Sequence, residues 1–118
     1  TIVEKIHFNG NEPPDQIAKK ALRTNLSDLA AMGADPEYYS LSISLPKAKS
    51  KSFIEIFVKG LKEDQKKYKI KLLGGDLTAS SQLITITINI IGTVPSGQWI
   101  SRSNSMVNDL LYVTGVLG

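Results

Sequence analysis

Two aspartates in glycine-rich, weakly charged surroundings are the side chains of this sequence best suited to chemistry. Asp28 lies within residues 25–34, which read Asn-Leu-Ser-Asp-Leu-Ala-Ala-Met-Gly-Ala, and Asp76 follows the pair Gly74-Gly75. Mg²⁺ takes oxygen ligands, commonly one or two carboxylates completed by substrate phosphates and water. A glycine pair also lets the backbone come close to a ligand. Together the two segments favour a site for a nucleotide and a divalent metal ion.

Each aspartate also has a purely structural interpretation. Asp76 is equally suited to an Asx turn, in which its carboxylate accepts a hydrogen bond from the backbone two residues on. Asn25 and Asp28 are three residues apart, so on a helix they share a face and could form an exposed polar pair. The neighbouring residues 26–32 are largely apolar, and a carboxylate in such a stretch needs a partner. Both interpretations stay open at this point.

The remaining polar candidates are single residues. His7 is the only histidine, and without a serine-histidine-aspartate or metal-histidine arrangement we interpret it as structural. Arg102 stands among serines and an asparagine, where its planar guanidinium could clamp a phosphate. Trp99 could stack on a base, but we expect it to anchor its loop. The absence of a Gly-x-x-x-x-Gly-Lys-Ser/Thr segment argues against a P-loop kinase, and no side chain is assigned as a catalytic acid, base or nucleophile.

The composition is that of an ordinary globular domain. The 118 residues are 42% hydrophobic and 21% charged, enough for one domain with a sizeable core. No apolar run approaches the roughly 20 residues of a membrane helix. The lack of cysteine excludes a disulfide framework and is compatible with a reducing cytoplasm. The net charge is +3, but the lysines of residues 59–71 are interleaved with Glu63 and Asp64, so we interpret them as the solvated face of a helix rather than a nucleic-acid site.

Hydrophobic periodicity predicts the elements that must position these residues. We expect strands at residues 2–8, 39–45, 69–73, 83–94 and 110–114, with helices at about 15–33 and 52–67. The order predicts an α+β fold, a two-layer sandwich of two main helices on one mixed β-sheet. Asp76 then follows the end of a strand. Two strands alternate large apolar residues with serine or threonine, so their second face meets water or a partner sheet in a dimer.

Four segments, taken in order, resemble the thiamine-monophosphate kinases, a family within the superfamily typified by aminoimidazole ribonucleotide synthetase. They are residues 3–8 with their His7-Phe8 ending, residues 25–34, Gly74-Gly75-Asp76 with Thr78, and Arg102-Ser103 followed by residues 109–118. The resemblance covers essentially the whole chain. It implies the amino-terminal domain of a two-domain homodimer, in which the amino-terminal sheets pack together and ATP binds near that interface. Residues 1–118 would then be one ATP-binding and dimerisation domain, truncated at its start and lacking the carboxy-terminal domain.

The resemblance also implies a reaction and a role for each matching residue. ATP, with Mg²⁺, would phosphorylate thiamine monophosphate to thiamine diphosphate by in-line transfer in a cytoplasmic enzyme. Asp28 and Asp76 match the metal-binding acids, and His7 with Phe8 lies in the region that faces the thiamine phosphate. The nucleotide-binding positions are Asn25, Gly74, Gly75, Asp76, Thr78 and Arg102. We expect neither a nucleic-acid partner nor a membrane partner.

The chain departs from the family pattern at several points. The family usually carries further metal-binding acids upstream of the strand that starts here, and it often has threonine in place of Leu77 and glycine in place of Asn104 and Asn108. Because the upstream acids and the carboxy-terminal domain are missing, we expect this chain alone to be inactive. The alternatives are another ATP-dependent member of the superfamily, such as a selenophosphate synthetase, the hydrogenase-maturation dehydratase or a purine-pathway synthetase, and a non-catalytic dimerising module in which both acids cap turns.

Overall fold

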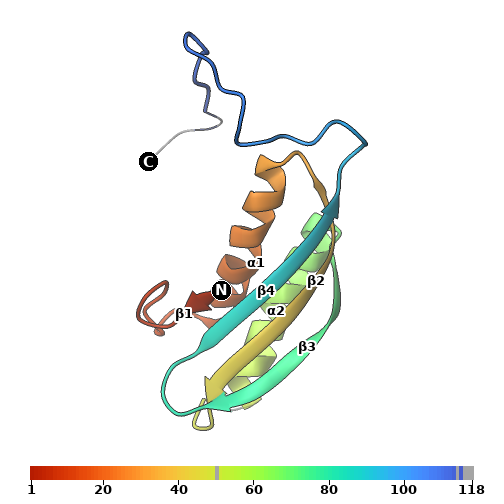
Figure 1. Ribbon diagram of the computed structural model, residues 1–118. Helices are drawn as coiled ribbons and strands as arrows, with labels where there is room; N and C mark the ends of the chain where they lie inside the picture. Colours follow the sequence, from red (N-terminus) through yellow and green to blue (C-terminus); the bar gives the residue numbers. More distant parts are fainter. Residues whose placement is uncertain (50, 114, 116–118) are drawn as a thin grey trace.

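Two long helices cover one face of a four-stranded sheet in the computed structural model, which describes residues 1–49, 51–113 and 115 (Figure 1). The elements are β1 (Ile2–Val3), α1 (Pro14–Ala31), β2 (Asp35–Pro46), α2 (Lys51–Tyr68), β3 (Lys71–Ser80) and β4 (Thr85–Thr93). The strand order is β1-β4-β2-β3, with β2 and β3 parallel and the other pairs antiparallel. The predicted α+β fold with two helices on a mixed sheet is confirmed.

The alternating sequence of the two central strands separates a core face from an open face. On the helix side lie the buried residues of β2 and β4, which pack under α1 and α2: Tyr39, Leu41, Ile43, Leu45, Ile86 and Ile88. The opposite face carries serine, threonine and asparagine, which the pairing register sets in rows across the strands. In one row Ser42 lies opposite Thr87, whose hydroxyl is 3.0 Å from that of Thr1. No helix covers this polar face in the described part of the chain (Figure 1).

The two helices approach each other closely because Gly60 lies at their contact. A Cβ atom at that position would be 2.5 Å from the carbonyl oxygen of Asp15 in the first turn of α1. Farther along, Arg23 forms two hydrogen bonds, of 2.7 and 2.8 Å, to the carboxylate of Asp64. Asp64 is only 1% exposed, so its predicted place on a solvated helix face is wrong. Because Arg23 supplies a bidentate charged partner, the carboxylate can be buried between the helices.

Three strand predictions differ from the structure. The first strand ends at Val3, because Lys5 adopts a left-handed conformation with φ of 62° and the backbone turns. β3 is longer than predicted and continues through Gly74-Gly75 to Ser80, because it pairs with β2 along this length after a bulge. Residues 110–113 form no strand and are exposed, because no strand of the described part of the chain lies beside them. Thr114, the predicted end of that strand, lies outside the described residues. Among the helices that the structure describes, none is both long and apolar enough to cross a membrane.

Candidate functional site

The Gly-Gly-Asp segment lies in the middle of the edge strand β3 rather than after its end. The pairing register aligns Gly75 with Leu41 and Asp76 with Ser42. Because Ser42 alternates with the buried residues of β2, Asp76 belongs to the same row of the open face as Ser42 and Thr87. The predicted position at a strand end, and the Asx turn with it, are therefore wrong. Asp76 is an exposed carboxylate on the polar face of the sheet.

The two glycines before Asp76 differ in their structural role. A Cβ atom on Gly75 would lie 1.7 Å from the carbonyl oxygen of Leu41, so this glycine lets the backbones of β2 and β3 come together. Gly74 has φ of 159° and no atom within 4 Å of its Cβ position. Thr78 lies two residues beyond Asp76, and its hydroxyl is 3.5 Å from the carbonyl oxygen of Ile43. Gly74 and the carboxylate of Asp76 are both exposed, so a ligand can reach them without disturbing the sheet.

The second aspartate lies on the helix layer, one turn before the end of α1. Asp28 is exposed, and the side-chain amide of Asn25 donates to the carbonyl oxygen of Ala21 at 2.8 Å. The apolar residues around Asp28 are largely uncovered, with Met32 48% exposed. The expected protein partner of Asp28 is therefore not found among the described residues. Its surroundings form an accessible, weakly polar surface at the carboxyl end of the helix.

The loop that carries Arg102 returns to this same end of α1. The N–H of Ile100 donates to the carbonyl oxygen of Met32 at 3.1 Å, directly after the helix. Gly33, with φ of 71°, leaves room for the side chain of Ile100. Figure 1 shows the loop crossing above the end of α1. Arg102 is exposed and is brought to the end of the molecule where Asp28 lies. Trp99, which we expected to anchor the loop, is 60% exposed, so this prediction is wrong. The backbone of Ile100 anchors the loop instead.

His7 lies in a tight turn between β1 and α1. Its ring Nδ1 accepts a hydrogen bond from the backbone N–H of Val3 at 3.0 Å, and the backbone N–H of His7 donates to the carbonyl oxygen of Val3 at 2.9 Å. Since Nδ1 is an acceptor, the neutral ring carries its proton on Nε2. The side chain is exposed. His7 therefore offers a hydrogen-bond donor of fixed identity at the surface, while the adjacent Phe8 is 5% exposed and belongs to the core.

Sequence reasoning missed the buried carboxylate beneath this turn. Glu4 is 6% exposed, and its carboxylate accepts hydrogen bonds from the backbone N–H of Ile84 at 2.9 Å and from the ammonium group of Lys49 at 3.0 Å. Burial by itself raises the pKa of Glu4, but the hydrogen bond from Ile84 and the hydrogen bond and charge of Lys49 outweigh it, so the pKa is lower than its ordinary value. In the expected strand Glu4 stands directly before Lys5, and neighbouring side chains of a strand point to opposite faces, so nothing in the sequence indicated that this carboxylate is buried. Its partner comes from 45 residues along the chain.

A narrow apolar cleft runs between α2 and the edge strand, behind the Gly-Gly-Asp segment. Its volume is about 260 Å³, and apolar side chains line it, among them Ile54, Phe57, Leu72 and Leu77. The cleft opens because β3 carries its leucines exposed at the edge, with Leu77 58% exposed. It contains no second acidic group to complement Asp76. Gly74, Gly75 and Asp76 border the cleft along the edge strand, whereas Asp28 and Arg102 are not among its lining residues.

The described residues do not by themselves form a metal centre. They contain no group of three or more acidic or histidine side chains close enough to share an ion. α1, which carries Asp28, packs on β4 and β2, whereas β3, which carries Asp76, is the edge strand beyond β2 (Figure 1). Each aspartate therefore offers one exposed carboxylate, which suits an ion whose other ligands are phosphates, waters and groups from outside the described fold.

Residues 1–94 match the family described as AIR synthase related protein, N-terminal domain. The chain belongs to this family. The match includes all six helices and strands of the fold, together with His7, Asp28 and the Gly-Gly-Asp segment. Arg102 lies beyond the matched residues.

Individual relatives extend the similarity beyond residue 94. The chain is 37% identical over 119 aligned residues to thiamine-monophosphate kinase of Bacillus subtilis, covering all of this chain and 37% of that protein. It superposes on the crystal structure of thiamine monophosphate kinase from Aquifex aeolicus with a TM-score of 0.81 and 27% identity, covering 89% of this chain and 35% of the other. A structure of AaThiL complexed with AMPPCP and TMP aligns with a TM-score of 0.73 and 30% identity, covering 77% of this chain and 29% of the other. The chain thus spans about a third of the length of the relatives it matches.

Proposed function

We propose that this chain is the ATP-binding, dimer-forming amino-terminal domain of a thiamine-monophosphate kinase. The protein would transfer the γ-phosphoryl group of ATP to the phosphate of thiamine monophosphate and release thiamine diphosphate and ADP. The observation that carries the proposal is the 37% identity, over the whole of this chain, to a thiamine-monophosphate kinase. The relative that was crystallised with AMPPCP and TMP supports both the nucleotide and the acceptor. We assign the activity to the cytoplasm, as the resemblance to these kinases implies.

Within this function Asp28 and Asp76 would hold Mg²⁺, which neutralises the charge that develops on the phosphates. Gly74 leaves the backbone of β3 open to a phosphate beside Asp76, with Asn25, Gly75 and Thr78 bordering these two positions. The guanidinium of Arg102 would bind phosphate oxygens through its planar fork. The exposure of all three charged side chains supports these roles. No protein side chain needs to act as acid, base or nucleophile, because phosphoryl transfer of this type depends on positioning and charge neutralisation.

The polar face of the sheet would be the dimer interface. No helix of the described part of the chain covers this face, and its serine and threonine hydroxyls form rows across three strands. Two such faces packed together would bury Asp76 beside the equivalent strands of a second copy. This arrangement would exclude water from the phosphates, which strengthens every electrostatic contact around them.

The thiamine phosphate would bind at the turn that carries His7 and Phe8. His7 offers an Nε2 donor to an acceptor oxygen, and Phe8 holds the turn in the core. A pocket of about 220 Å³ lies beside this turn, with Phe8, Glu12 and Lys20 in its wall. The cation of Lys20 and the histidine donor are both suited to a phosphate.

The test is an assay of the full-length protein with Mg²⁺, ATP and thiamine monophosphate, in which thiamine diphosphate is measured directly. Asp76→Asn should lose product formation but leave the fold of each subunit stable, because within a single chain the side chain is exposed. Asp35→Asn, an exposed aspartate at the start of β2, is the matched control and should retain activity. A folded protein that binds ATP but makes no thiamine diphosphate would indicate another acceptor within the superfamily. A protein that does not bind ATP at all would favour the non-catalytic dimerising module.

A further inference from the structure

The carboxylate of Glu4 is buried, and both of its oxygens accept hydrogen bonds. Oε2 accepts the N–H of Ile84 at 2.9 Å and Oε1 lies 3.0 Å from Nζ of Lys49. The backbone of Glu4 also donates to the carbonyl oxygen of Ile84 at 2.9 Å. A buried ion pair is a poor source of net stability compared with apolar residues of the same volume. Its value lies in the geometry that it imposes on the groups it joins.

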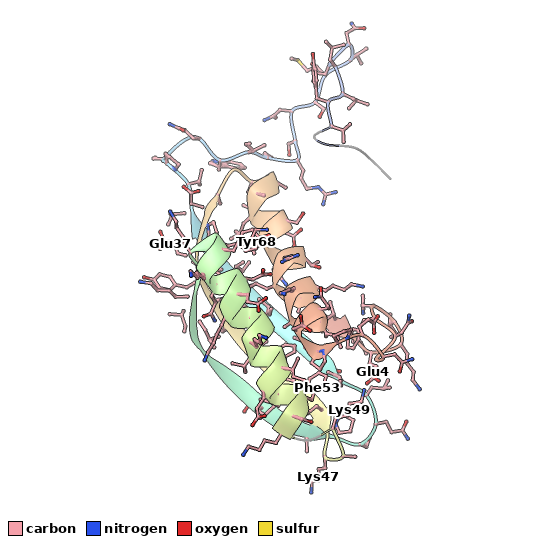
Figure 2. All side chains as sticks on the ribbon, turned by 180° about the vertical axis from the view of Figure 1, so that it is seen from behind. Glu4, Glu37, Lys47, Lys49, Phe53 and Tyr68 are labelled. Carbon is pink, nitrogen blue, oxygen red and sulfur yellow. The ribbon has the colours of Figure 1, made fainter. Side chains whose placement is uncertain are left out.

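Those groups belong to three segments that are distant in sequence. Lys49 comes from the connection between β2 and α2, and Ile84 lies just before β4. Nζ of Lys49 also lies 3.4 Å from the carbonyl oxygen of Gly10, at the far end of the turn that starts after Glu4. Figure 2 shows Glu4 and Lys49 next to each other at this end of the molecule. The ion pair thus connects both ends of the turn to the sheet and to the start of the second helix.

Gly10 completes the arrangement by leaving space for the carboxylate. Its φ is 88°, and a Cβ atom at this position would lie 2.2 Å from Oε1 of Glu4. Any other residue would be strained and would push the carboxylate away from Lys49. The turn is therefore matched to a charged group beneath it.

Two groups of His7 in this turn lie near the pocket, its ring and its carbonyl oxygen. Nδ1 of His7 is occupied by the N–H of Val3, so that Nε2 is the free donor, and the side chain is exposed. The carbonyl oxygen of His7 accepts a hydrogen bond from Lys20, a wall residue of the pocket of about 220 Å³ beside the turn. Small shifts of the turn would change the position of the His7 ring relative to this pocket and to Lys20.

We propose that Glu4 and Lys49 are positioning residues that hold the turn of residues 5–10 so that His7 and the pocket beside it fit the phosphate end of the acceptor substrate. The pair contacts no substrate itself and acts through the backbone of the turn. This inference rests on the proposed function, because that function supplies the acceptor. It adds a set of residues, Glu4, Lys49 and Gly10, that controls the affinity for the acceptor but not for ATP.

The experiment uses the full-length protein with Glu4→Gln, Lys49→Met and, as the matched control, Glu63→Gln. Glutamine keeps the size of the side chain, but it puts an NH2 donor in the place of one of the two oxygens that accept from Ile84 and Lys49. Glu63 also pairs with a lysine, Lys19, at 2.6 Å, but its side chain is 50% exposed and lies on α2. We expect the KM for thiamine monophosphate to rise about tenfold in both variants, with the KM for ATP changed less than about twofold. The control should match the wild type.

Amide hydrogen exchange supplies a readout that does not depend on activity. The N–H groups of Lys5 and His7 are bonded within the turn, to Phe8 and Val3, and should exchange about tenfold faster in both variants while the amides of β2 stay protected. Gly10→Ala, which disturbs the carboxylate from the other side, should reproduce both effects.

Two results would overturn the positioning role in a protein whose wild type makes thiamine diphosphate. One is a lower melting temperature with an unchanged KM for thiamine monophosphate, which would make the ion pair merely structural. The other is unchanged exchange at Lys5 and His7. A wild type that makes no thiamine diphosphate would instead overturn the proposed function, and with it the acceptor named here, while faster exchange in the variants would still show that Glu4 holds the turn.

Discussion

Replacing Gly75 by alanine tests whether the Gly-Gly-Asp segment is shaped by the sheet or by a ligand. The added Cβ atom would lie 1.7 Å from the carbonyl oxygen of Leu41, whereas Cβ atoms essentially never come within 3.0 Å of another heavy atom. β2 and β3 must therefore separate locally by more than an ångström. Since β3 pairs with β2 alone in the described sheet, no strand on its other side resists this movement.

The expected cost follows from the hydrogen bonds that such a separation breaks. Two ladder bonds next to Gly75 would be lost, each with a net value of about 1 kcal/mol, and the displaced strand adds strain of similar size. We expect the free energy of unfolding to fall by about 2–4 kcal/mol. Urea denaturation measures this quantity directly.

Gly74→Ala is the matched control, one residue away in the same strand. Nothing lies within 4 Å of its Cβ position, although φ of 159° is at the edge of the range that favours glycine. This variant should cost about 1 kcal/mol or less. Equal stabilities of the two variants would refute the close-approach argument. If Gly75→Ala kept its stability and lost only ATP affinity, Gly75 would serve the ligand and not the sheet.

Three further predictions concern the packing and charge of the fold. Arg23→Met should lower the free energy of unfolding by about 1–3 kcal/mol, because the carboxylate of Asp64 stays buried without its partner. Combining Arg23→Met with Asp64→Leu should recover most of this loss, which urea denaturation of the single and double variants checks. Gly60→Ala should gain helix propensity but lose more by separating α2 from Asp15, a net loss of about 1–2 kcal/mol in thermal denaturation, and a gain would contradict the contact. Folding lowers the pKa of Glu4 below its ordinary value of 4.5, so its contribution to stability is complete above that pH and is lost as the pH falls through the lowered pKa. Free energies of unfolding measured from pH 6 to pH 3 should therefore fall less steeply in Glu4→Gln than in the wild type.

The fold class and the candidate residues could be predicted from local patterns. The alternation of apolar and small polar residues in 39–45 and 83–94 predicted two strands with one buried face, and both strands are confirmed as β2 and β4. The spacing of apolar residues predicted both helices to within a few residues. These patterns are readable because the repeat of a strand or a helix depends only on neighbouring residues.

The position of Asp76 required the tertiary structure. Two glycines before an acid read as the end of a strand, and a short apolar run before them supported that interpretation. The strand continues instead because β2 lies alongside with a free edge and because the bulge and Gly75 let the two backbones approach. Pairing with a distant strand is not encoded in the local pattern, so neither the length of β3 nor the face that carries Asp76 could be read from it.

Charge partners were the second feature that only the tertiary structure decided. In the sequence, Glu4 is one acid in a predicted strand and Asp64 one acid on a lysine-rich helix. Lys49 and Arg23, which are 45 and 41 residues away, make their burial possible. The sequence alone thus determined the two helices, the two central strands and the residue types capable of chemistry, since these follow from local periodicity and residue type. Which carboxylates are buried and which stay exposed depended on contacts between segments far apart in the chain, because only folding brings a compensating charge to Glu4 and Asp64.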